Sequence, residues 1–472
     1  MLFNSLVFAV FLPVVFAIYW LLRRNRKGQN LVIVVASCVF YGWWDARFVF
    51  LLLFSTALDY FTGLRIEASE QKHARRTWLW ISVAINLGFL GVFKYYNFFV
   101  TEFNDLLGTF GIHAHPTLLD VLLPVGISFY TFHGLSYVID IYNRRIHAER
   151  SFIDYSVFVS FFPLLVAGPI ERATHLLPQV VRPRTFDPAA ATDGMRQMLW
   201  GFFKKAVIAD NCSPVVDSIF AHPSWHTGDT LALGAVLFAF QIYGDFSGYS
   251  DIAIGCARLF GFSLLRNFAY PYFSRDIAEF WRRWHISLSS WFRDYVYVPL
   301  GGSRGTLPVK LRNVLVIFLL SGFWHGANWT FIVWGAINAL LFIPLLLRGK
   351  NRKHDRAASL VQLKDLPAVL FTFGCTVIAW IFFRAGNMTE ALEYLRGMAT
   401  PTLLGIPDEL TWWLAALIGV LLIAEWLQRA RPHGLAIAHL APWERRLAYS
   451  GVFLLIFFFG RFDGDTFIYF QF

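Results

Sequence analysis

Long apolar runs alternate with short polar segments along almost the whole chain. A helix needs roughly 17–25 mostly apolar residues to cross a bilayer, so this pattern predicts an all-helical polytopic membrane protein. Several runs are too short for a straightforward crossing, and there we expect re-entrant or broken helices surrounded by protein or by a watery cavity. The predicted segments are residues 6–22, 31–44, 48–64, 78–98, 118–142, 152–170, 231–255, 311–323, 329–347, 366–384, 412–427 and 447–459.

Basic residues fall between the apolar runs and give the first part of the chain an orientation. The segments at 23–29, 65–77 and 143–151 carry Lys or Arg, whereas the loop at 101–116 carries neither. Because cytoplasmic loops are enriched in Lys and Arg, this alternation predicts an N-terminus outside the cytoplasm. The first run precedes its basic cluster, so we interpret it as a retained span and not as a signal peptide. Residues 171–210 are interpreted as a cytoplasmic loop and an interfacial helix, with Lys204 and Lys205 at the lipid headgroups.

The composition supports a membrane protein and narrows its partners. Of the 472 residues, 57% are hydrophobic and only 15% are charged, against about 25% charged residues in soluble domains. The net charge of +10 lies mainly in loops, which is typical of positive-inside topology and argues against a nucleic-acid partner. The four cysteines show no CxxC spacing and are expected to be small buried side chains. No internal repeat or soluble domain is visible, so we predict one membrane domain over residues 1–472.

A histidine at membrane depth is the first candidate for chemistry. His325 follows an apolar run and lies between Gly322 and Gly326, which suggests a broken helix open to a cavity. An ionisable group at this depth is costly, and burial favours the neutral imidazole that a general base needs. A hydrogen-bonded core histidine is the alternative. Asn328 could orient the imidazole or a substrate.

A second histidine lies about 40 residues upstream in a basic, aromatic segment. If residues 279–295 form one helix, His285 lies on an aromatic face with Trp284, opposite Arg282, Arg283 and Arg293. Attachment to the membrane surface would explain part of this pattern. Arg304, Lys310 and Arg312 follow, and together these cations would form a collar that suits the phosphates of a nucleotide-bearing thioester such as acetyl-CoA.

Two acidic residues also lie within an apolar run. Asp245 and Asp251 need partners at that depth, and hydrogen bonds between helices would provide them. No histidine accompanies them at ligand spacing, so we predict no metal site. His133 is flanked by apolar residues and is a minor candidate.

Taken together, these segments resemble the membrane-bound O-acyltransferase family. The likeness is greatest to the bacterial branch that contains the alginate O-acetyltransferase membrane subunit and the D-alanyl transferase of teichoic acid modification. The strings that carry it are Tyr41-Gly-Trp-Trp44, Phe93-Lys-Tyr-Tyr-Asn97, residues 123–130, Ala167-Gly-Pro-Ile170, residues 243–251, the His285 and His325 segments, and residues 467–472.

The resemblance implies a fold and roles for both histidines. The fold would be a ring of transmembrane helices around a thinned centre, with re-entrant or broken helices. His325 would be the principal catalytic residue and His285 the second motif histidine. Acyl groups would arrive from the cytoplasm and leave outward, with a periplasmic acetyltransferase as partner.

Our hypothesis from the sequence is a subunit of the bacterial inner membrane that O-acetylates an extracytoplasmic polysaccharide such as alginate. Acetyl-CoA would be the donor, and no cofactor would be bound permanently. D-alanyl transfer from a carrier-protein thioester is one alternative, and a proton-coupled transporter is another. Cellulose, another exopolysaccharide and peptidoglycan are further candidate acceptors. The residues expected to bind the donor are Arg282, Arg283, Trp284, Arg293 and Asn328.

Overall fold

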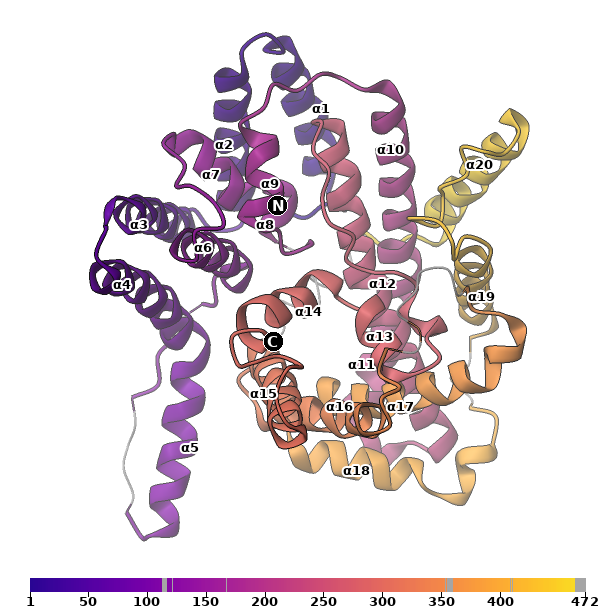
Figure 1. Cartoon of the computed structure of the whole chain (residues 1–472). Coiled ribbons are helices and arrows are strands. Elements are labelled where there is room, and N and C mark those ends of the chain that lie inside the picture. Colours follow the sequence, from indigo (N-terminus) through magenta and orange to yellow (C-terminus); the bar gives the residue numbers. More distant parts are fainter. Residues whose placement is uncertain are drawn as a thin grey trace. The chain divides into compact units, whose positions relative to one another are not determined.

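The computed structural model describes residues 1–112, 117–120, 122–166, 168–352, 354, 360–407, 409 and 411–462 (Figure 1). Helices form the regular secondary structure of these ranges, with no strand among them. Six helical segments in the described part are long and apolar enough to cross a membrane: Arg47–Ala68, Lys72–Thr109, Gly228–Leu259, Leu307–His325, Trp329–Leu347 and Leu363–Arg384. The prediction of an all-helical polytopic membrane protein is confirmed. Residue 167 and residues 467–472, which carry part of the family resemblance, lie outside the described residues.

The described residues divide into two compact units. The first contains Met1–Ala191 and Ala257–Leu264, and the second contains Thr192–Cys256 and Leu265–Phe472. Both histidines singled out above belong to the second unit.

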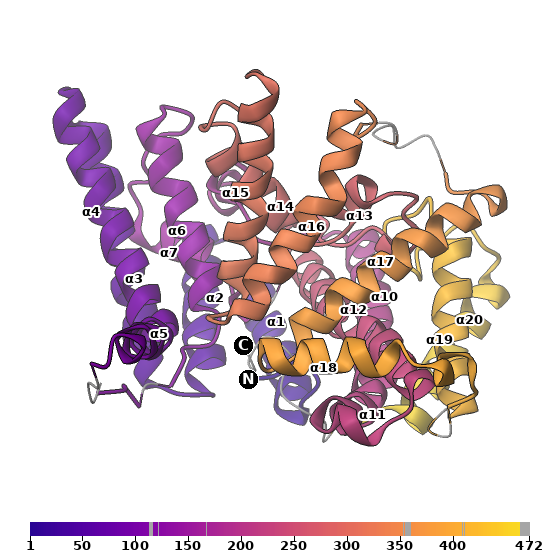
Figure 2. The ribbon, with the colours of Figure 1, turned by 90° about the horizontal axis from the view of Figure 1, so that it is seen from below.

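The first unit is a set of packed helices joined by buried polar contacts. The helices α3, α4 and α6 pack against one another (Figures 1 and 2). Asp59 of α3 accepts hydrogen bonds from Ser82 Oγ at 2.6 Å and Asn86 Nδ2 at 2.8 Å, both on α4. Such bonds hold helices together where water is absent. The elements are α1 (Leu6–Leu21), α2 (Arg26–Gly42), α3 (Arg47–Ala68), α4 (Lys72–Leu90), η1 (Gly91–Tyr95), α5 (Tyr96–Thr109), α6 (Ile127–Tyr142), α7 (Phe152–Ser160), α8 (Phe162–Leu165) and α9 (Ala173–Val180).

Two predicted spans of this unit are interrupted. In the segment at 118–142 the helix α6 begins at Ile127, directly after Gly126, which adopts a left-handed conformation with φ 75°. The segment at 152–170 consists of α7 and α8, which are separated at Phe161, and α8 has a proline in its first turn. The predicted fold includes broken helices, and α7 and α8 fit it; the late start of α6 was not predicted. His133 has an ordinary role in this unit: its Nε2 accepts the backbone N–H of Glu171 at 3.2 Å.

The second unit is built around α12, most of whose side chains are buried. The helices α15 and α16 lie side by side in both views. A Cβ on Gly322 would lie 2.2 Å from the carbonyl oxygen of Phe331, so their backbones approach closely. The elements are α10 (Pro188–Phe202), η2 (Phe203–Ala209), α11 (Asp210–Ala221), η3 (Pro223–Trp225), α12 (Gly228–Leu259), η4 (Pro271–Phe273), α13 (Ile277–Arg283), α14 (Ile286–Phe292), η5 (Arg293–Tyr297), α15 (Leu307–His325), α16 (Trp329–Leu347), η6 (Leu363–Asp365), α17 (Leu366–Arg384), α18 (Met388–Met398), η7 (Pro401–Leu404), α19 (Trp412–Leu427) and α20 (Pro442–Phe459).

Lys204 and Lys205 do not lie on a surface, and the prediction that they reach lipid headgroups is wrong. Both are buried, on the π-helical segment η2, which packs against glycines of α12. The Nζ of Lys205 lies 2.8 Å from both Asp210 Oδ1 and Asp245 Oδ1. The Nζ of Lys204 lies 2.6 Å from Asp251 Oδ2. The acidic residues of the apolar run therefore have lysine partners, a pairing that burial of the charges requires.

Replacing Lys205 with Met should destabilise the protein by about 3–5 kcal/mol, because two carboxylates would remain buried without their shared cation. The melting temperature of the purified protein in detergent measures this loss. Lys72→Met, at an exposed position, is the matched control and should melt like the wild type. Equal melting temperatures for Lys205→Met and wild type would show that the buried pairs do not stabilise the fold.

Candidate functional site

His285 lies at a sharp break between two short helices. Residues 279–295 do not form one helix, as the sequence pattern had predicted: α13 ends at Arg283 and α14 begins at Ile286. His285 itself is left-handed, with φ 42° and ψ 54°, a conformation that non-glycine residues rarely adopt. Two backbone hydrogen bonds hold the break, from Ala269 N–H to the Arg283 oxygen and from Ile286 N–H to the Asn267 oxygen, both at 2.9 Å.

The side chain of His285 is buried and neutral. Its Nδ1 lies 3.0 Å from Asn267 Oδ1, and its ring packs edge-on against Phe246 at 4.5 Å between centroids. Burial lowers the pKa of His285 to about 3, because the charged imidazolium loses its hydration. Its Nε2 has no hydrogen-bond partner among the described residues.

His325 closes α15 and lies in an aromatic cluster. It is the last residue of the helix, and Gly326 continues as extended backbone. The rings of Trp324, Trp334 and Phe383 lie 4.9, 5.2 and 5.2 Å from its ring. The Trp324 ring also lies 6.2 Å from that of His285. The two histidines therefore belong to one aromatic cluster, in which Trp324 contacts both.

A cation-lined cavity of about 350 Å³ lies next to this cluster. Its wall includes Ser321, one helical turn before His325, and Trp281, whose ring lies 5.6 Å from that of Trp334. None of the lining residues that the structure describes is acidic; they are Ala278, Trp281, Arg282, Ser289, Phe292, Arg293, Tyr297, Ser303, Val314, Ile317, Phe318, Ser321, Phe342, Asn351 and Arg352. Three guanidinium groups beside hydroxyl groups form a chemical environment that suits an anion such as phosphate.

The remaining predicted site residues have different surroundings. Arg283 pairs with Glu279 at 2.6 Å and does not line the cavity. Trp284 is buried, with its ring 4.9 Å from that of Trp380. Asn328 caps α16 by accepting the Thr330 N–H at 3.0 Å, and its amide donates to the Gly386 oxygen at 2.6 Å. These contacts position the walls of the site. Arg304, Lys310 and Arg312 do not line the cavity either.

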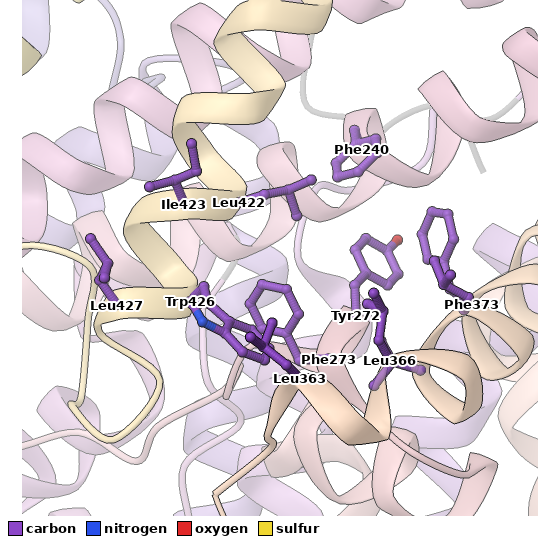
Figure 3. Close-up of a pocket in the computed structure, with 12 residues that line it drawn as sticks. Phe240, Tyr272, Phe273, Leu363, Leu366, Phe373, Leu422, Ile423, Trp426 and Leu427 are labelled. Atoms are coloured by element: carbon purple, nitrogen blue, oxygen red, sulfur yellow. The ribbon is translucent and has the colours of Figure 1, made fainter.

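A second cavity, of about 410 Å³, has a different character (Figure 3). It lies between α17 and α19, and its twelve lining residues include no charged side chain. Leu366 and Phe373 line it from α17, and Ile423 and Trp426 from α19. Such a surface suits hydrocarbon and offers no ion pair to a phosphate, so the cation-lined cavity is the candidate for a phosphorylated donor.

Asn267 is a residue of this site that the sequence pattern does not predict, and Arg352 of the cavity wall is another. Asn267 is fully buried between α12 and α13, and it contacts Ser250, His285 and Ser287. In sequence it is one asparagine in a short connecting segment, with no periodicity or motif to mark it. In the described part of the chain no group of three or more His, Cys, Asp or Glu side chains is arranged to hold a metal ion.

Comparison with known proteins identifies relatives over most of the chain. The model of the membrane-bound O-acyltransferase family matches residues 143–385, which include both histidines. The chain is 42% identical over 402 residues to the "Probable alginate O-acetylase" of Azotobacter vinelandii, covering 84% of this chain and 78% of that protein. It is 35% identical to the "Peptidoglycan O-acetyltransferase" of Helicobacter pylori, covering 84% of this chain and 80% of the relative. It is 25% identical to the "Teichoic acid D-alanyltransferase" of Streptococcus thermophilus, covering 61% of this chain and 75% of that protein.

Proposed function

We propose that the acyl group which this chain transfers is acetyl. The chain belongs to the membrane-bound O-acyltransferase family and is a multi-pass membrane O-acyltransferase. The donor would be cytoplasmic acetyl-CoA, and the acceptor an extracytoplasmic polysaccharide such as alginate. Relatives named as acetylases or acetyltransferases are more similar to the chain than the D-alanyltransferase is. The membrane would be the bacterial inner membrane, and a periplasmic acetyltransferase would be the partner that completes delivery. All of residues 1–472 would serve this one activity.

One observation supports the site assignment above all others: two buried imidazoles share an aromatic cluster beside a cation-lined cavity. In the proposed reaction His325 accepts the proton of an acceptor hydroxyl. The hydroxyl oxygen then attacks the thioester carbonyl and forms the new ester bond. The C–S bond breaks, and the thiolate leaves and takes up the proton. The surrounding rings exclude water, which would otherwise hydrolyse the thioester.

His285 would assist through its second ring nitrogen. The Nε2 has no hydrogen-bond partner among the described residues, so it can accept a hydrogen bond from a bound substrate. Its neutral form is retained at physiological pH because burial lowers its pKa to about 3. A neutral imidazole with an available lone pair is the form that general-base chemistry requires.

The donor phosphates would bind to the cation-lined cavity. Arg282, Arg293 and Arg352 line it, and Arg282 is held by a 2.9 Å bond to the Asn351 oxygen. Arg283, Trp284 and Asn328 would support the site by holding α13, the aromatic cluster and the start of α16. The pantetheine arm of acetyl-CoA would then run from this cavity past Ser321, one helical turn before His325, to the thioester.

Removal of either imidazole should nearly abolish acyl transfer, since general-base assistance contributes roughly 10²–10⁴-fold. His325→Gln and His285→Gln preserve a polar side chain of similar size, and the release of coenzyme A from labelled acetyl-CoA by the purified protein measures turnover. His147→Gln is the control, because His147 is exposed and its Nδ1 lies against Glu67. Full activity in a normally folded His325→Gln protein would overturn the assignment of the base.

Arg282→Gln should raise the KM for acetyl-CoA about 10-fold or more, because a charge-assisted hydrogen bond is worth about 1.5–3 kcal/mol. S-acetyl pantetheine, which lacks the nucleotide, should show the same KM with wild type and variant. Arg47→Gln, at an exposed position paired with Asp45, is the control. An equal rise in KM for acetyl-CoA and for S-acetyl pantetheine would show that the nucleotide binds elsewhere. If the wild-type protein turned over neither donor, a carrier-protein thioester would be favoured as the donor.

A further inference from the structure

The side chain of Asn267 joins α12, His285 and the start of α14. Its Nδ2 donates to Ser250 Oγ of α12 at 3.0 Å. Its Oδ1 accepts from Ser287 Oγ at 2.8 Å and lies 3.4 Å from the Ser287 backbone nitrogen. The same oxygen lies 3.0 Å from His285 Nδ1. The backbone N–H of Ser287 can only donate, so it requires the amide oxygen and not the amide NH₂ on this side.

This orientation fixes the tautomer of His285. An amide oxygen has no proton to donate, so the ring nitrogen facing it must carry the hydrogen. A neutral imidazole carries one proton, and the Nε2 of His285 is therefore an acceptor with its lone pair directed away from Asn267. A buried polar atom without a partner costs about 1–3 kcal/mol, and native structures retain few such atoms without a reason.

The backbone of Asn267 supports the same arrangement. Its carbonyl oxygen accepts the Ile286 N–H at 2.9 Å, directly after the left-handed His285. Left-handed backbone at a non-glycine residue persists only where surrounding contacts enforce it. One residue thus holds both the strained backbone and the proton of the imidazole.

We infer that Asn267 is a positioning residue for acyl transfer, which holds His285 in the Nδ1–H tautomer so that Nε2 can accept a proton or hydrogen bond in the site. This inference rests on the proposed function of His285. Loss of the amide would free the ring to rotate or to adopt the other tautomer, in which Nε2 carries the proton and cannot accept.

The charged groups around His285 are already paired or hydrogen-bonded to other residues, so a negative charge at position 267 would act on the imidazole of His285. The ring itself faces Phe246 of α12, Phe268 and Trp324 of α15. The charged groups on the neighbouring elements have partners. Arg283 pairs with Glu279, Asp251 with Lys204, and Arg384 of α17 with Asp217. The Nε of Arg266 donates to the Phe268 oxygen.

Asn267→Asp tests the inference through pH. The aspartate keeps the acceptor oxygen, but its negative charge stabilises the imidazolium and raises the pKa of His285 from its low value. Protonated His285 has no lone pair at Nε2, so kcat/KM for acetyl-CoA should gain an acidic limb and fall as the pH is lowered from 8 to 5. The wild type should show no limb from His285 in this range, since its pKa is about 3.

Asn267→Ala should lower kcat on the order of 10²-fold at every pH, with little change in KM. Asn211→Ala is the matched control: it removes a buried amide of the same unit that bonds to backbone oxygens of Ala206, Val207 and Phe459. The control should melt lower but keep the wild-type pH profile.

The outcomes separate the two proposals. If His285→Gln is inactive while Asn267→Ala turns over like wild type and Asn267→Asp keeps the wild-type pH profile, the positioning role is wrong. If His285→Gln is itself fully active, the proposed function of that histidine fails first.

Discussion

A polar group that is buried in this helical chain must find its partner inside the protein, and several such pairs include a residue of α12. Asp245 and Asp251 of this helix pair with Lys205 and Lys204 of η2. The hydroxyl of Tyr243, also on α12, donates to Glu425 of α19 at 2.7 Å. The same helix carries Ser250, which accepts from Asn267. The second unit is therefore held together along one buried helix by directional bonds, and the site is attached to it through Asn267.

The same constraint shapes the chemistry of the site. An imidazole among aromatic rings is kept neutral by burial, and its tautomer is set by the single acceptor that faces Nδ1. Arg282, Arg293 and Arg352 line the adjacent cavity; Arg293 also pairs with Asp294 at 2.8 Å, and Arg283, outside the cavity, pairs with Glu279. The aromatic cluster and the cation-lined cavity are neighbours, because Trp281 of the cavity wall packs against Trp334 of the cluster.

The sequence predicted the helical class, the break at His325 and the aromatic surroundings of both histidines, because apolar runs, paired glycines and tryptophans are local signals. It did not predict the break at His285, since the 3.6-residue pattern of residues 279–295 continues through it and only backbone bonds to Asn267 and Ala269 impose it. The burial of Lys204 and Lys205 depends on carboxylates up to 47 residues away in the chain. Pairings at such distances leave no periodic trace in one sequence.

We expect one acyl donor to span the cation-lined cavity and the two-histidine cluster. A cryo-EM structure of the protein with a non-hydrolysable thioether analogue of acetyl-CoA would show where the donor binds. Its phosphates should lie within hydrogen-bond distance of Arg282, Arg293 or Arg352, and its acetyl carbonyl beside His325 and His285. An analogue bound in the apolar cavity of Figure 3, or with its carbonyl remote from both imidazoles, would contradict this expectation.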